Sequence, residues 1–136
     1  MADSSFLATR LDRDAVPLAI GDLIALIVLL TIGALNHSTV EFLFANPLYL
    51  LEVYAPFLIG WILVAPLIGA YSAGAVETAK SSVPLAIRSW IPAAVVGLAL
   101  RHFVFRGSAA LTFAAVMLVL GSVVLGGWRA LYFRFR

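Results

Sequence analysis

Four long apolar segments occupy most of this chain of 136 residues and restrict what it can fold into. They cover residues 17–35, 48–71, 83–105 and 109–130, boundaries that are approximate. Each holds roughly 19 to 24 residues, enough for a helix rising about 1.5 Å per residue to cross about 30 Å of hydrocarbon. The strands of a membrane barrel are shorter, with about 10 residues of alternating polarity. The sequence therefore predicts an all-α fold, a four-transmembrane-helix bundle with short loops.

The composition agrees with a membrane-embedded chain. Hydrophobic residues make up 63% of the sequence and charged residues 12%, whereas a soluble domain carries about 25% charged residues. Residues 1–16 are predicted to be a short polar N-terminal tail, 17–130 the transmembrane domain and 131–136 a basic C-terminal tail. We interpret the first apolar segment as a span rather than a cleaved signal peptide, because it is longer than usual for one and contains Asp22.

The distribution of basic residues predicts the orientation. Lysine and arginine are enriched in the cytoplasmic loops of membrane proteins. With four spans, six basic residues fall on the side that holds both termini and two on the other: Arg10, Arg13, Lys80, Arg129, Arg134 and Arg136 against Arg101 and Arg106. We therefore expect a multi-pass protein of the cell membrane with both termini in the cytoplasm.

Several classes of function lack support in the sequence. The chain has no cysteine, so thiol catalysis and cysteine-ligated zinc are excluded. A net charge of +2 is too small to indicate nucleic-acid binding. His37, His102 and Glu41 could bind a metal in principle, but they lack the close spacing that metal motifs use. No nucleophile–base arrangement is evident, so we expect neither an enzyme, nor a metal site, nor a cofactor.

Four ionisable residues lie inside the apolar segments, where charges usually pair or line a cavity. Asp22 and Arg88 each lie five residues inside the cytoplasmic edge of their segments, about 7 to 8 Å deep. Glu52 and Arg101 share a depth near the outer edge. Matching depths predict two intramembrane pairs, Asp22 with Arg88 and Glu52 with Arg101, with either a structural or a transport role.

Other residues indicate how the helices are shaped and placed. Pro56, Pro66 and Pro92 each remove a backbone hydrogen bond inside a segment, so they are candidate helix-break positions. Trp128 and Arg129 end the fourth segment and are interpreted as an interfacial anchor. Small residues four positions apart indicate close helix packing, as at the pairs Gly21 and Ala25, Ala65 and Gly69, Ala110 and Ala114, and Ser122 and Gly126.

Short motifs are spread over nearly the whole chain beyond the N-terminal tail: GD at 21–22, PFLIGW at 56–61, PLIGAY at 66–71, RSW at 88–90, GLALR at 97–101 and GWR at 127–129. In these motifs the chain resembles the uncharacterised domain-of-unknown-function family 3054. The resemblance implies a small multi-span membrane protein of the kind found in haloarchaea and bacteria. It implies no activity and no catalytic residues.

Two functional hypotheses follow. The embedded charges and the two prolines of the second segment favour an oligomeric transport or permeation protein. The small size and the lack of a ligand motif favour a non-catalytic accessory or assembly subunit of a larger membrane complex. In both cases we expect the partners to be the lipid bilayer and either further copies of the chain or other membrane subunits, and no nucleic acid.

The topology can be tested with single cysteines, since the chain has none of its own. A cysteine replacing Ser38 is expected to react with an impermeant maleimide added to intact cells, because the first loop should face outward. A cysteine replacing Ser81 should react only after the membrane is permeabilised. Labelling of both positions from outside would contradict the predicted orientation.

Overall fold

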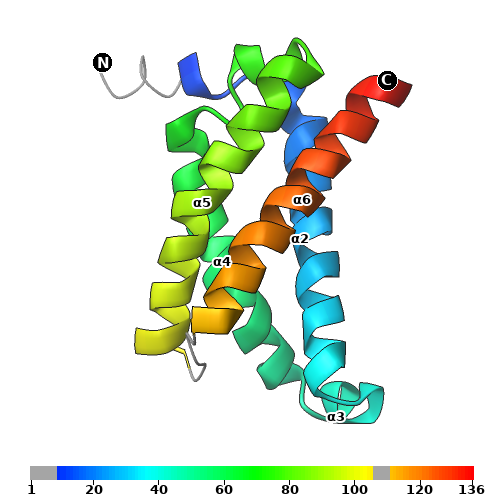
Figure 1. Ribbon diagram of the computed structural model, residues 1–136, viewed down its shortest axis with the longest axis vertical. Coiled ribbons are helices and arrows are strands. Elements are labelled where there is room, and N and C mark those ends of the chain that lie inside the picture. Colours follow the sequence, from blue (N-terminus) through cyan, green and yellow to red (C-terminus); the bar gives the residue numbers. More distant parts are fainter. Residues whose placement is uncertain (1–8, 106–110) are drawn as a thin grey trace.

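The computed structural model describes residues 9–105 and 111–136. Four long helices run up and down the bundle (Figure 1): α2 (Val16–His37), α4 (Pro47–Ile68), α5 (Ala79–Phe103) and α6 (Leu111–Phe135). All four are long and apolar enough to cross a membrane, so the predicted helical fold is confirmed at that level. Arg106 and the first two residues of the predicted fourth span lie outside the described residues.

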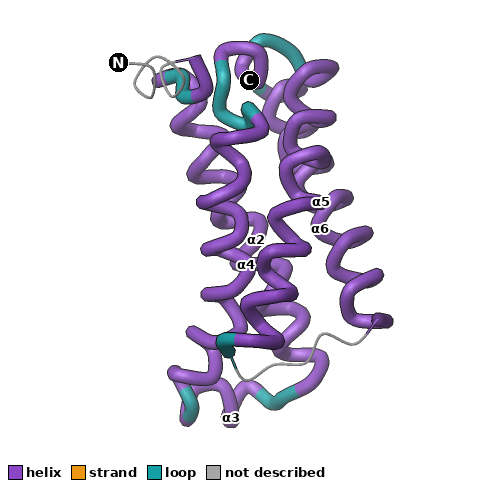
Figure 2. The backbone as a smooth tube through the Cα atoms, turned by 90° about the vertical axis from the view of Figure 1, so that its left-hand side faces the viewer, coloured by secondary structure: helices purple, strands orange, loops and turns teal. Residues whose placement is uncertain are grey.

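Shorter elements join the long helices. The single-turn helix η1 (Arg13–Ala15) leads into α2, and α3 (Val40–Ala45) connects α2 with α4 at the far end of the bundle. The turn η2 (Ala73–Val76) precedes α5. The N-terminal part of α2 and the C-terminal end of α6 lie at the same end (Figures 1 and 2), opposite α3.

Local signals at the helix ends explain where the structure departs from the predicted boundaries. Helix α4 ends at Ile68 instead of continuing to residue 71, because Gly69 adopts a left-handed conformation with φ of 104°. Helix α5 begins at Ala79, four residues before the apolar segment, because the Thr78 side chain caps its first turn by accepting from the Ser81 N–H. Helix α6 runs on to Phe135, so most of the predicted basic tail is helical.

The prolines do not interrupt their helices. Helix α4 continues through Pro56 and Pro66, and α5 continues through Pro92. A membrane helix tolerates such residues when neighbouring helices and small local adjustments satisfy the freed carbonyls. The three candidate break positions are therefore sites of a missing hydrogen bond within continuous helices.

Aromatic side chains fill the interior of the bundle. Phe57, Trp61 and Trp90 are buried, at most 1% exposed. Their rings belong to a continuous series, which we call the aromatic column, with neighbouring centroids 6.1 to 6.4 Å apart: Phe113, Phe57, Trp90, Trp61 and Tyr71. The Trp90 indole N–H donates to the Met117 carbonyl at 2.9 Å, which satisfies the polar end of a fully buried ring.

Two glycines allow α4 and α5, the most extensively packed pair of helices, to approach closely. A Cβ on Gly60 would lie 2.5 Å from the Ala93 carbonyl oxygen of α5. A Cβ on Gly97 would lie 3.1 Å from the Phe57 Cα of α4. Since backbone atoms cannot move aside as a flexible side chain can, both positions require glycine.

We therefore expect Gly60→Ala to lower the free energy of unfolding by about 1–3 kcal/mol through overpacking. Gly33→Ala is the matched control, because a Cβ there meets nothing within 4 Å. That control should be neutral or stabilising, since alanine favours a helix by up to about 1 kcal/mol over glycine. Thermal unfolding in detergent compares the two variants, and equal melting temperatures would contradict the packing argument.

Candidate functional site

The centre of the candidate site is an ion pair between the first and last long helices. The Asp22 carboxylate accepts from the Arg129 guanidinium twice, at 2.6 Å from Nη2 to Oδ2 and at 3.2 Å from Nε to Oδ1. Both side chains are 0% exposed. Asp22 lies six residues after the start of α2, and Arg129 lies six residues before the end of α6. The two helices run in opposite directions, so the two residues meet at one depth.

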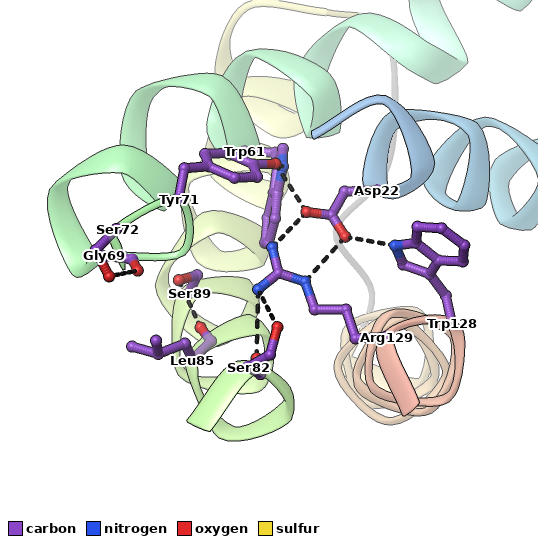
Figure 3. A network of polar contacts seen from close by, with 10 residues as sticks. All are labelled: Asp22, Trp61, Gly69, Tyr71, Ser72, Ser82, Leu85, Ser89, Trp128 and Arg129. Carbon is purple, nitrogen blue, oxygen red and sulfur yellow. Dashed lines mark hydrogen bonds and ion pairs between the residues drawn. The ribbon is translucent and has the colours of Figure 1, made fainter. Parts of the chain in front are cut away.

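Two further donors complete the surroundings of Asp22 (Figure 3). The Tyr71 hydroxyl donates to Oδ2 at 2.8 Å, and the Trp128 indole N–H donates to Oδ1 at 3.1 Å. Each carboxylate oxygen therefore accepts two hydrogen bonds. Such hydrogen bonds favour the ionised form of a carboxylate whose side chain is 0% exposed.

The far side of the Arg129 guanidinium is held by α5. The Arg129 Nη1 donates to the Ser82 carbonyl at 3.3 Å and to the Ser82 hydroxyl oxygen at 3.2 Å. Its central carbon lies 5.6 Å from the centre of the Tyr71 ring, within cation–π range. In the described part of the chain, every buried side-chain nitrogen and oxygen has a hydrogen-bond partner.

Tyr71 is positioned by the segment that follows α4. The left-handed Gly69 turns the chain out of the helix, and the Tyr71 carbonyl then accepts from the Asp12 N–H at 2.7 Å. The Trp61 indole N–H donates to the Tyr71 hydroxyl oxygen at 2.7 Å, so that hydroxyl proton points to Asp22. Burial, and then the nearby Asp22 charge, raises the pKa of Tyr71, which therefore remains a donor at neutral pH.

Trp128 lies between Asp22 and the outer surface of the bundle. Its ring packs directly against Gly21, at a place where any Cβ would collide with it. The ring also lines an apolar groove of about 590 Å³ on the outside of α2 and α6, formed by Val16, Pro17, Ile20, Gly21, Ile24, Ala25, Val28, Val124 and Trp128. The indole thus presents an apolar face to the groove and its N–H to the carboxylate.

The predicted partner of Asp22 is wrong. Arg88 is exposed on the outer face of α5 and contacts no other charged side chain among the described residues, whereas Arg129 makes the ion pair. The reason is helix order: α2 packs against α6 and α4, and α5 packs between α4 and α6. Equal depth therefore does not bring Arg88 to Asp22.

The predicted roles of Trp128 and Arg129 also change. Arg129 is fully buried rather than an interfacial anchor, and half-buried Trp128 donates to Asp22. Sequence reasoning missed Tyr71, Trp61 and Ser82 as members of the network. Tyr71 and Trp61 both lie in motifs of the family resemblance, but nothing in their spacing indicates a shared carboxylate.

The outer pair is not formed. Arg101 lies over the Phe113 ring, with its guanidinium carbon 4.6 Å from the ring centre. In the described ranges no ion pair joins it to Glu52, which is half-buried on α4. The end of the aromatic column, rather than a carboxylate of α4, is therefore the described neighbour of this cation.

The arrangement is suited to holding helices together. One carboxylate and one guanidinium connect α2, α5, α6 and the segment after α4, with donors matched to acceptors. Within residues 9–105 and 111–136, no three His, Cys, Asp or Glu side chains gather as a set of metal ligands. Chemically, the site is a neutral, hydrogen-bonded ion pair enclosed by aromatic rings.

Removing either member of the pair should destabilise the bundle more than removing both. We expect Asp22→Asn or Arg129→Met to cost about 3–5 kcal/mol, because each leaves a buried partner uncompensated. The double variant should recover much of that loss, as measured by thermal unfolding in detergent. Arg88→Met is the control and should be close to neutral, while additive losses in the double variant would contradict the coupling.

The chain was compared with protein families, curated proteins and solved structures. A family model described as "Protein of unknown function (DUF3054)" matches residues 19–132. No curated protein and no solved structure matches. The match runs from Ala19 in α2 to Tyr132 in α6 and includes Asp22, Tyr71 and Arg129. The chain therefore belongs to the DUF3054 family.

Proposed function

We propose that this protein is a non-catalytic accessory or assembly subunit of a membrane complex, and that the Asp22–Arg129 network is a structural lock. The observation that carries the proposal is the full hydrogen bonding of Asp22 by four protein donors. A carboxylate that binds and releases an ion or proton needs a free position or a donor that can leave. Here the donors come from α6 and from the segment after α4. Arg129 is held by Ser82, and Tyr71 is held by the Trp61 indole.

The filled interior supports the same proposal. The aromatic column extends from Phe113 to Tyr71, and Trp61 and Trp90 within it are at most 1% exposed. A path for ions through a single bundle would have to displace these rings. The protein is therefore better suited to present a stable helical surface than to open through its own centre.

The alternative is an oligomeric transport or permeation protein. It is supported by a carboxylate buried inside a span, which in membrane proteins often marks a pathway. In this alternative the pathway runs between copies of the chain, because each interior is occupied by side chains. We propose the same setting for both functions: a multi-pass protein of the cell membrane, with cytoplasmic termini, in a homo-oligomer or larger complex.

A flux assay distinguishes the two functions. The full chain is reconstituted in proteoliposomes, and fluxes of protons, Na⁺, K⁺ and Cl⁻ are measured for the natural sequence, for Asp22→Asn and for the Asp22→Asn, Arg129→Met double variant. The assembly function predicts no protein-dependent flux in any of them. It also predicts a stable complex larger than one chain when native membranes are solubilised mildly.

Protein-dependent flux that Asp22→Asn abolishes, while thermal unfolding shows an intact fold, would overturn the proposal in favour of transport. A protein that remains a single chain in mild detergent, and in native membranes after crosslinking, would overturn the assembly function. Arg88→Met serves as a matched control for the loss of a basic residue away from the network.

A further inference from the structure

Arg88 is a charged side chain inside the long apolar helix α5, and it has no partner among the residues that the structure describes. It is exposed, and among the described residues it makes no hydrogen bond, ion pair or ring contact. It lies nine residues after the start of α5 and five after Val83, the first residue of the apolar segment. Charges at such positions are costly unless something compensates them.

The surroundings of Arg88 indicate what that compensating group is. Lys80, Arg88, Ile91 and Val95 are spaced by eight, three and four residues and share one face of α5, which is exposed at all four positions. Two cations thus lie toward the start of the helix, about 12 Å apart along its axis. Two apolar side chains, 49% and 55% exposed, continue the face deeper into the membrane.

The direction of the arginine side chain fits this arrangement. Side chains on a helix lean toward its N-terminus. The N-terminus of α5 lies at the same end of the bundle as the start of α2 and the end of α6 (Figure 1), the end with more basic residues. Arg88 can therefore extend its guanidinium to the level of the lipid headgroups while its stem stays among acyl chains.

We propose that the exposed face of α5 formed by Lys80, Arg88, Ile91 and Val95 binds an acidic phospholipid. The two basic side chains hold the headgroup phosphate, and an acyl chain lies along Ile91 and Val95. The ligand is defined by its chemistry, a phosphate with net negative charge attached to a hydrocarbon tail. This inference goes beyond the assembly function and holds whether or not that function is correct.

A second copy of the chain in the same orientation fits this face less well. Among the described residues, the exposed acids at this end are Asp14 and Glu77, and both lie outside the long helices. The acids within long helices are Asp22, whose oxygens are occupied, and Glu52, which lies near the opposite end. The long helices of a like-oriented copy therefore offer no unoccupied described carboxylate at this end, so that such a copy could meet the guanidinium only through Asp14 or Glu77, whereas acidic lipid supplies phosphates all around the helix at the level that the side chain reaches.

The test uses a single fluorophore beside Arg88. Because the chain has no cysteine, Ile91→Cys provides a unique attachment point for bimane on the full-length protein. The labelled protein is reconstituted in vesicles containing brominated phosphatidylglycerol or brominated phosphatidylcholine, which quench on contact. A second protein labelled at Val123→Cys, an exposed position on α6, reports the bulk lipid.

We expect acidic lipid to quench the Ile91 label with about a fivefold preference over zwitterionic lipid, the effect of roughly one basic residue near the surface. Arg88→Gln should lower this preference to the part that Lys80 contributes, the double variant with Lys80→Gln should bring it near one, and Arg88→Lys should keep most of it. The Val123 label should show no preference. Since Arg88 is exposed and has no hydrogen bond or ion pair within the described ranges, its variants should keep the melting temperature that the parent has in detergent.

Three results would overturn the proposal. Equal quenching of the Ile91 label by both lipids would show that the face does not select charge. Loss of the preference on addition of millimolar inorganic phosphate would assign the site to a soluble anion. Weak quenching by both lipids, together with crosslinking of the Ile91→Cys position to a protein, would show that a protein covers the face.

Discussion

The Asp22 carboxylate has to be satisfied entirely by the protein, and much of the bundle follows from that requirement. Its four hydrogen bonds come from Tyr71, Trp128 and Arg129, which lie on two separate parts of the chain. Arg129 in turn is fixed by Ser82 of α5. The position of α2 beside α6, the turn after α4 and the depth of α5 are thus coupled through one carboxylate. In hydrocarbon, where helices do not associate by excluding water, such polar contacts specify which surfaces meet.

Packing supplies what the polar network does not. The ion pair lies toward one end of the bundle, whereas Phe57, Trp90 and Phe113 continue the aromatic column away from it. Gly60 and Gly97 allow α4 and α5 to approach closely. Gly60 lies against the backbone of Ala93, and Gly97 lies against Phe57. The two mechanisms are complementary: polar contacts select the neighbours of α2, and close packing holds α4 and α5 together.

The sequence predicted the four long apolar helices well, because a run of about 20 apolar residues has few other structures available to it. It predicted helix ends less well. The left-handed Gly69 ends α4 and the capping Thr78 begins α5, at positions that differ from the predicted ones. Neither position is marked by a change in hydropathy. The pairing error has a similar origin. Ending the fourth span at residue 130 placed Arg129 at the end of its helix, whereas α6 continues to Phe135 and Arg129 is buried inside the bundle.

Matching depth in the predicted spans could not by itself identify Arg129 as the partner of Asp22. It established that Asp22 needs a cation, but the order of helices around the bundle decides which cation is adjacent, and that order depends on side-chain packing across helices. The contributions of Tyr71 and Trp61 are harder still to foresee. They depend on a turn that brings Tyr71 back over the end of α4, and on a contact between the Tyr71 and Asp12 backbones.

The 107 positions that separate Asp22 from Arg129 have a consequence for biogenesis. Because α6 follows α2, α4 and α5 in the chain, the Asp22 carboxylate is synthesised well before the Arg129 guanidinium that neutralises it. Tyr71 precedes α6 in the chain, whereas the Arg129 guanidinium is synthesised only with α6. A chain that stops before α6 leaves Asp22 with the Tyr71 hydroxyl alone among its described donors, because Trp128 and Arg129 both belong to α6. Helix α6 thus completes the hydrogen bonding of a side chain that belongs to α2.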